Sequence, residues 1–330
     1  MPSRNRQVIA AVVLVPVLAA LALWAFAWPA SRIAPRDLPL GVAGPATAVT
    51  QVARQLERHE GAFEIHRYAD EAAARDAIGD RSVYGALVVT PQGPELLTAS
   101  AAGPAVAQFL QQAVAQRAAG EGARVRTVDV VPTPSGDPRG VVLNAAILPL
   151  ALAGIAAGAA VTLLGLRGRR AVLALLGASA VVGVVAAGIA HSWLGALGGA
   201  WWAEAGVLAL STLAVGGAVA GLAALAGPAG TGIGAALVML IGNPFSGATS
   251  APQMLPEPAG AIGQWLPPGA GTSLLRSVAY FDGAAATGPA LTLTWWAVLG
   301  LGAVLLGGAL RARRVGAGPA ADRRELSAVA

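Results

Sequence analysis

The sequence predicts an α-helical polytopic membrane protein with six transmembrane helices and a small α/β domain inserted between the first and the second. Two observations support this fold class. Hydrophobic residues make up 55% of the 330-residue chain and charged residues 12%, whereas soluble domains carry about a quarter charged residues. The charges are also segregated along the chain. Between positions 141 and 310 the charged side chains are Arg167, Arg169, Arg170, Glu204, Glu257, Arg276 and Asp282.

The first transmembrane helix is expected at residues 8–28, within an N-terminal unit of residues 1–30. This stretch has no charged side chain and is about as long as the 20 residues that a bilayer core requires. Arg4 and Arg6 precede it and predict a cytoplasmic N-terminus. A cleaved signal peptide, ending at the Ala-Phe-Ala sequence of 25–27, is the alternative. The apolar run is long for a signal peptide, which favours the transmembrane helix.

Residues 31–140 differ in character, because their charges are nearly balanced and strand patterns alternate with helix patterns. Strands are expected at 38–43, 63–68, 84–90, 95–99 and 125–131, and helices near 49–58, 71–78 and 104–119. Asp70 is the expected N-cap of the second of these helices. About 100 residues suffice for an independent core. We therefore expect an extracytoplasmic α/β domain, which returns to the membrane through a linker at 132–139.

Five further transmembrane helices are expected within residues 141–314. They cover 141–166, 171–190, 205–225, the short stretch 231–241 and 289–310, with a tight turn at 227–230. Gly154 and Gly158, and likewise Gly217 and Gly221, have the spacing that lets helices approach closely. The remaining residues 315–330 are polar and rich in small side chains, which predicts a disordered cytoplasmic tail.

The segment 242–283, called the broken segment below, interrupts this pattern. It is mostly apolar, yet it is so rich in Pro and Gly that no single helix can run through it. Irregular backbone beside a membrane needs protein or water to satisfy its polar groups. We therefore expect a re-entrant segment on the outer face, surrounded by the other helices. Its second half, 272–281, has the pattern of an interfacial helix.

Six transmembrane helices with cytoplasmic termini satisfy two independent rules. This topology puts the basic clusters near 167–170 and 311–314 in the cytoplasm, as the positive-inside rule requires. It also puts seven tryptophans near the outer interface, where amphipathic rings are favoured. These are Trp28, Trp193, Trp201, Trp202, Trp265, Trp295 and Trp296.

Catalytic chemistry finds little support in the sequence. The chain has no Cys and every basic residue is Arg, which excludes disulfides, thiolate metal sites and a phosphate-loop lysine. His59, His66 and His191 are scattered, so no metal site or cofactor is expected. We see no nucleophile paired with a base and expect no enzyme. The surplus Arg lies beside the membrane helices, so the sequence pI of about 10.8 does not indicate nucleic-acid binding.

Energy coupling is better constrained by the sequence. Ion-driven transporters usually bury ionisable residues near the bilayer midplane, and the interiors of the expected helices contain none. The chain also lacks a phosphate-loop motif with which to hydrolyse ATP. If this protein moves a substrate, another subunit must therefore supply the work.

Several stretches resemble a known family. They are Leu-Pro-Leu-Gly-Val-Ala at 38–43, Tyr-Ala-Asp-Glu-Ala at 68–72, Tyr-Gly-Ala-Leu-Val-Val at 84–89, Asp-Pro-Arg-Gly at 137–140, Asn-Pro-Phe-Ser-Gly at 243–247, Leu-Pro-Pro at 266–268 and Leu-Leu-Arg-Ser at 274–277. In this order, and with a large outer domain after one N-terminal helix, the chain resembles the type-2 permeases of ATP-binding-cassette exporters. Within them it is most similar to the phage-infection-protein-like membrane proteins.

The resemblance implies a dimeric permease in the lipid bilayer that exports lipids, drugs or polymers with energy from a separate cytoplasmic ATPase. It implies an outer gate in the broken segment, with Asn243, Pro244, Phe245, Pro267, Pro268 and Arg276 as candidates. It also implies contact with the ATPase at the loop that carries Arg167, Arg169 and Arg170. Family members commonly have an amphipathic helix before the first crossing and a longer loop at this place. This chain departs from that pattern, because about seven residues precede its first crossing and its loop is little more than residues 167–170. The alternative is a non-transporting membrane protein whose outer domain binds an envelope component or a partner protein.

Overall fold

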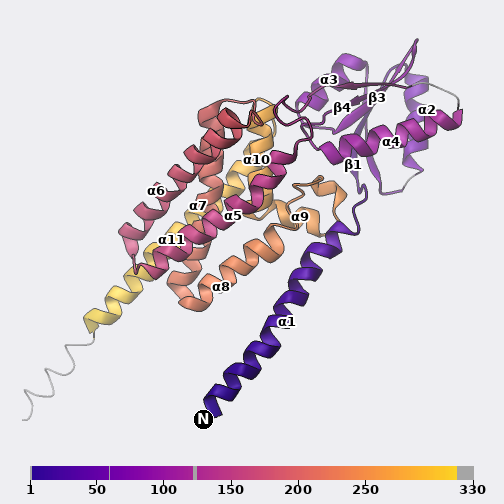
Figure 1. Cartoon of the computed structure of the whole chain (residues 1–330). Coiled ribbons are helices and arrows are strands. Elements are labelled where there is room, and N and C mark those ends of the chain that lie inside the picture. The colour runs from indigo at the N-terminus through magenta and orange to yellow at the C-terminus, as the bar shows by residue number, and fades with distance from the viewer. Residues whose placement is uncertain (1, 59, 122–124, 318–330) are drawn as a thin grey trace, which may run out of the picture.

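The computed structural model describes residues 2–58, 60–121 and 125–317, and two parts of it contain most of the helices and all the strands (Figure 1). Residues 31–140 contain a five-stranded sheet and its helices, and are called the sheet domain below. The second part, called the bundle, consists of α5 (Val141–Leu163), α6 (Gly168–Ala187), α7 (Trp201–Ala226), α8 (Pro228–Ala236) and α11 (Thr287–Ala317). The sheet domain lies at one end of the bundle.

Five helices of the described chain are long and apolar enough to cross a membrane. Four belong to the bundle, namely α5, α6, α7 and α11, and the fifth is α1 (Pro2–Ala30). In α7, 67% of the most apolar window is buried inside the molecule, against 28% or less in the other four. α7 is therefore the central helix, and the others present most of their apolar side chains to the surroundings.

The expected fifth membrane helix at 231–241 is shorter than a bilayer is thick. Its place is taken by α8 and a π-helical turn, η2 (Leu237–Gly242), which continues directly from α8. At about 1.5 Å per residue the pair spans about 22 Å, less than the roughly 30 Å hydrocarbon core. The expected turn at 227–230 is also shorter, because α8 already begins at Pro228.

Other helix boundaries in the structure differ by a few residues from those expected from the sequence. The second membrane helix ends at Leu163 rather than 166, and the third begins at Gly168 and continues through the π-helical η1 (Gly188–Trp193). α11 runs to Ala317, so the expected tail does not begin at 315. Its remainder, 318–330, lies outside the described residues.

The bundle packs through glycines at its helix crossings. A Cβ added to Gly158 of α5 would lie 2.7 Å from the Gly216 carbonyl oxygen, and one added to Gly300 of α11 would lie 2.3 Å from the Gly217 carbonyl carbon. Backbones that approach this closely leave no room for a side chain. The small-residue spacing of α5 and α7 therefore serves helix packing.

The broken segment contains three short helices instead of one long one. They are η3 (Pro252–Met254), α9 (Ala259–Gln264) and α10 (Pro267–Tyr280). Prolines occupy the first positions of η3 and α10, where the missing N–H costs nothing. The sequence predicted an interfacial helix at 272–281. That prediction is wrong, because α10 begins earlier and is buried along nearly all its length.

The sheet domain follows the expected order of strands and helices. Its strands are β1 (Leu38–Ala43), β2 (Phe63–Tyr68), β3 (Gly85–Thr90), β4 (Gly93–Thr98) and β5 (Arg126–Asp129), arranged as β2-β1-β3-β4-β5. All neighbours are parallel except the hairpin β3–β4. α3 (Glu71–Gly79) covers one face, and α2 (Ala46–Glu57) and α4 (Pro104–Glu121) cover the other. Asp70 caps α3 as predicted, since its side chain accepts a hydrogen bond from the Ala73 N–H.

Candidate functional site

The broken segment folds back on itself where α9 meets the chain after η2. A Cβ on Gly263 would lie 1.7 Å from the Phe245 carbonyl oxygen, so this crossing requires glycine. The Gln264 side chain fixes the same crossing, because its Nε2 donates to the Ser246 carbonyl oxygen (3.0 Å) and its Oε1 accepts from Ser273 Oγ (2.6 Å). The compact fold satisfies much of the irregular backbone internally, which is the condition for placing it beside lipid.

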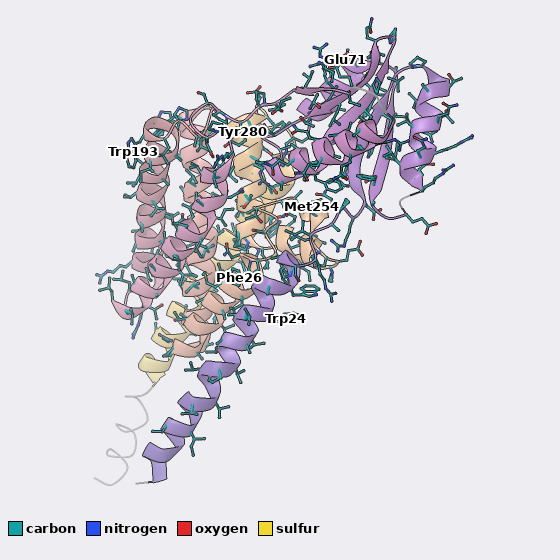
Figure 2. The ribbon with its side chains drawn as sticks, turned by 45° about the vertical axis from the view of Figure 1, so that its right-hand side comes forward. Trp24, Phe26, Glu71, Trp193, Met254 and Tyr280 are labelled. Atoms are coloured by element: carbon teal, nitrogen blue, oxygen red, sulfur yellow. The ribbon has the colours of Figure 1, made fainter. Side chains whose placement is uncertain are left out.

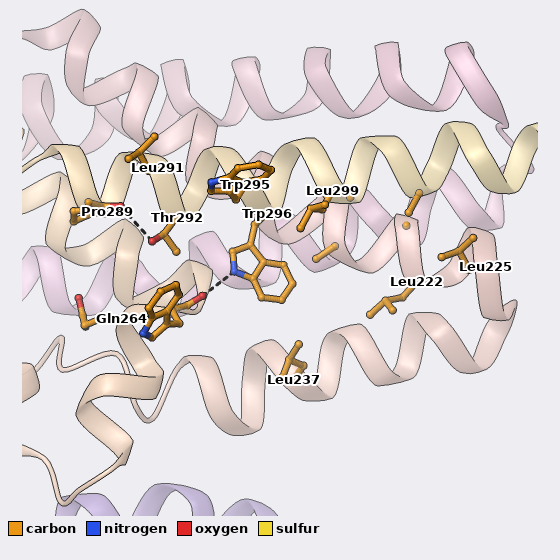
Figure 3. Close-up of a pocket in the computed structure, with 16 residues that line it drawn as sticks. Leu222, Leu225, Leu237, Gln264, Pro289, Leu291, Thr292, Trp295, Trp296 and Leu299 are labelled. Atoms are coloured by element: carbon orange, nitrogen blue, oxygen red, sulfur yellow. Dashed lines mark hydrogen bonds between the residues drawn. The ribbon is translucent and has the colours of Figure 1, made fainter.

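An apolar cavity of about 820 Å³ lies along the bundle beside this fold (Figure 3). α7 and α11 form one side and η2 the other, while Gln264 and Trp265 close one end. Trp296 Nε1 donates a hydrogen bond to the Trp265 carbonyl oxygen (2.8 Å), which joins α11 to the end of α9. The lining residues are Ala218, Gly221, Leu222, Leu225, Leu237, Gln264, Trp265, Gly288, Pro289, Leu291, Thr292, Trp295, Trp296, Leu299, Gly300 and Ala303.

The cavity opens sideways, toward the surface that the long apolar helices present. Leu291, Trp295 and Leu299 line it and are more than half exposed along one side of α11. The lining side chains that carry polar atoms are Gln264, Thr292 and the three tryptophans, and the Thr292 hydroxyl already donates to the Gly288 carbonyl oxygen (3.2 Å). Such a space suits an apolar chain or ring that arrives from lipid, and offers little to a polar solute.

Arg276 of α10 is the buried charge of this region, with 3% of its surface exposed. Its Nη2 donates to the Ala248 carbonyl oxygen (2.5 Å) and lies 3.4 Å from Asn144 Oδ1 on α5. Among the described residues no carboxylate forms an ion pair with it. The guanidinium therefore holds the broken segment to α5 through neutral acceptors.

A second arginine joins the sheet domain to α10. Arg81 Nη1 donates to the Ser273 carbonyl oxygen (2.9 Å) and to Ser277 Oγ, and its guanidinium lies 5.4 Å from the centre of the Phe281 ring. Burial lowers the pKa of Arg81, and the nearby Tyr84 opposes that change. The packed guanidinium fixes the sheet domain on the end of the broken segment.

Further hydrogen bonds continue this junction along η3. Tyr84 OH donates to Gln253 Oε1 (2.9 Å), and Arg36 Nη1 donates to the Met254 carbonyl oxygen (3.1 Å). Figure 2 shows Met254 below the sheet domain and Tyr280 near the top of the bundle. The sheet domain and the broken segment are therefore parts of one packed unit.

The proposed gate residues lie around the cavity end but do not line the cavity. Asn243 and Pro244 follow η2, and Phe245 is buried with its ring 6.1 Å from that of Trp28 on α1. Pro267 and Pro268 form the first turn of α10 and line a separate gap of about 30 Å³ against α5 and α7. The nearest lining residues, Gln264 and Trp265, are not among the sequence candidates, although Trp265 precedes the Pro-Pro pair directly.

The arginines of the α5–α6 connection lie at the end of the bundle opposite the sheet domain. Arg167 is the N-cap of α6, and Arg169 and Arg170 follow in its first turn, all three exposed. Arg167 and Arg311 of α11 line one shallow depression of about 70 Å³. Positive charge from the α5–α6 connection and from α11 thus gathers at this end.

A contact between His191 of η1 and Glu204 of α7 closes the other end of α6 and α7. Glu204 is fully buried, and its carboxylate contacts His191 Nδ1 (2.8 Å) and accepts from the Gly199 N–H (2.8 Å).

Within the described ranges no cluster of three or more His, Asp and Glu side chains could hold a metal ion; His59 lies outside those ranges.

The sheet domain contains a cavity of its own, about 650 Å³ in volume, between α2, α4 and the sheet. It is separate from the bundle cavity and shares none of its lining residues.

Comparisons with models of protein families, with curated proteins and with solved structures found no match for this chain.

Proposed function

We propose that this protein is an integral membrane, permease-like subunit of an ATP-binding-cassette type exporter that moves a lipid or another apolar molecule. The observation that carries the proposal is the sideways-open apolar cavity between α7, η2 and α11, with the broken segment at its end. Five long apolar helices are compatible with a multi-pass membrane protein. A substrate that enters from the bilayer reaches Trp265 and Gln264, where a small movement of α9 opens or closes the cavity end.

The topology that goes with this function has six crossings and cytoplasmic termini. α8 and η2 begin the fifth crossing, and the broken segment completes it toward the sheet domain, which lies outside. This orientation puts Arg167, Arg169 and Arg170 in the cytoplasm, where the ATPase subunit docks. A second copy of the chain completes the exporter.

Among the described residues, Glu204 is the buried carboxylate of a long helix, and it lies in the first turn of α7 in contact with His191 rather than at mid-helix, which disfavours coupling to an ion gradient. The work must then come from a partner. Purification of the full-length chain from its own membrane should recover an ATPase, and membrane vesicles that contain the pair should export a fluorescent lipophilic dye when ATP is added.

A blocked cavity tests the route. Thr292→Trp puts a bulky ring into the bundle cavity and should abolish most of the ATP-dependent dye export. Thr294→Trp is the matched control, because Thr294 is exposed on the same helix outside the lining and should leave export unchanged. Equal export by both variants would exclude this cavity as the route.

The second candidate function is a non-transporting membrane protein whose sheet domain binds an envelope component or a partner protein. The separate cavity in that domain favours it. Repeated purification without any ATPase, together with retained ligand binding by the sheet domain, would decide for this candidate and against the exporter.

A further inference from the structure

The sheet-domain cavity forms because two helices leave part of one sheet face uncovered. α2 packs over β1 and β2 and α4 packs over β4, and the cavity lies between the two helices on this face of the sheet. Leu87 and Leu96 are cross-strand neighbours that line the cavity. Protein interiors are normally close-packed, and an unfilled space of about 650 Å³ forfeits dispersion contacts along its whole lining.

The interior of this cavity is aliphatic. Leu40 and Leu96 are almost completely buried in its floor, and Leu87 and Val114 are half-buried in its walls. Phe63 is the one aromatic side chain among the described lining residues. An interior without buried polar groups rejects polar solutes, because their hydrogen bonds to water would be lost without replacement.

The polar groups of the lining lie at the solvent-facing rim. Gln55 of α2 and Gln116 and Arg117 of α4 are all exposed. Arg117 Nη2 donates to Gln55 Oε1 (2.8 Å), which joins the two helices across the rim. A guanidinium and two amides next to an apolar interior match a molecule with an apolar tail and a head that accepts hydrogen bonds. Arginine favours a carboxylate or phosphate in that position.

The cavity floor continues into the broken segment. Leu40, Leu96 and Leu110 line the cavity and belong to the same buried cluster as Ala251 and Met254, which flank or form η3. A tail that fills the cavity therefore packs on the side chains that fix the sheet domain to the bundle.

We propose that the sheet domain binds a single linear acyl chain with an anionic head, the tail between α2 and α4 and the head at Arg117. The volume lies within the range of about 300–1,000 Å³ typical of small-molecule sites. The proposal rests neither on transport nor on the direction in which the chain is inserted. It concerns a cavity that is separate from the proposed export route.

The test uses the full-length protein in phosphatidylcholine vesicles with a photoactivatable analogue of palmitic acid. After irradiation, peptide mass spectrometry should locate adducts on α2, α4 and β3. Ala113→Trp puts a bulky ring into the cavity from an exposed position of α4, and it should lower these adducts about tenfold, the effect of displacing roughly two buried methylene groups of the bound chain. Ala115→Trp is exposed on the same helix outside the lining and should leave them unchanged.

The head group is tested with a second probe. Arg117→Gln should lower labelling by the acid and spare labelling by the matching photoactivatable fatty alcohol. Equal loss of both labels would overturn the assignment of an anionic head.

The tail site is overturned if the sheet domain carries no adducts, or carries as many in Ala113→Trp as in the unmodified protein. A two-chain phosphatidic acid probe that labels these peptides as strongly as the palmitic acid analogue would overturn the single-chain assignment. Thr292→Trp should leave sheet-domain labelling intact, so failure of the export route and failure of this site are told apart.

Discussion

At the scale of single residues, Arg276 joins two parts of the broken segment and contacts α5. A buried guanidinium without a carboxylate partner is costly unless its hydrogen bonds are made, and here they go to Ala248 and Asn144. Arg276→Met removes the charge and leaves the Ala248 carbonyl without this donor. A buried acceptor without a partner costs about 1–3 kcal/mol.

We therefore expect Arg276→Met to lower the midpoint of thermal unfolding in detergent. Arg139→Met is the control, since Arg139 is exposed, and such surface changes stay within about 0.5 kcal/mol. A higher midpoint for Arg276→Met would contradict this account and would mean that the charge is kept at a cost to stability.

At the scale of helices, glycine contacts hold α7 against its neighbours. The added Cβ of Gly300 would lie 2.3 Å from the Gly217 backbone, whereas one added to Gly302 has no atom within 4 Å. Gly300→Leu should force α11 away from α7 and destabilise the bundle by about 1–3 kcal/mol, the usual cost of overpacking. Gly302→Leu, two residues along the same helix, should be tolerated. Comparison of their thermal unfolding checks this, and equal behaviour would show that α7 and α11 separate without cost.

At the scale of the whole molecule, the proposed orientation puts the sheet domain and the α5–α6 connection on opposite sides of the membrane. The chain has no cysteine, so single cysteines can report on each side without background labelling. In whole cells a membrane-impermeant maleimide should label Gln92→Cys in the exposed β3–β4 turn and spare Arg169→Cys. Both should react after the membrane is permeabilised. Labelling of Arg169→Cys alone in intact cells would reverse the topology.

The elements of the sheet domain could be predicted from sequence, because each depends on a local pattern. The alternation at 63–68 marks β2, and the position of Asp70 before Glu71 marks the start of α3. The strand order could not be predicted in the same way. β1 lies between β2 and β3, and β4 pairs with β5 across the intervening α4, and these pairings join residues far apart in the chain.

The candidate site was only partly predictable, for the same reason. The prolines of the broken segment indicate an interruption, but the contact of Arg276 with Ala248 depends on how α10 folds back. A helix near 231–241 was expected, and α8 with η2 lies there, but its 228–242 range is too short to count among the five long apolar helices. Gln264 and Trp265 carry no pattern that marks them as the end of a cavity.

The sequence by itself determined the long apolar helices, the interruption between residues 242 and 283 and the α/β character of residues 31–140. Hydropathy, periodicity and proline content act over neighbouring residues, and the chain displays them directly. Only the tertiary structure decided where the two cavities lie. Leu237 and Leu299 face one space, and Gln55 and Arg117 meet at the rim of another, because helix packing at distant glycines and strand pairing across the sheet set those distances.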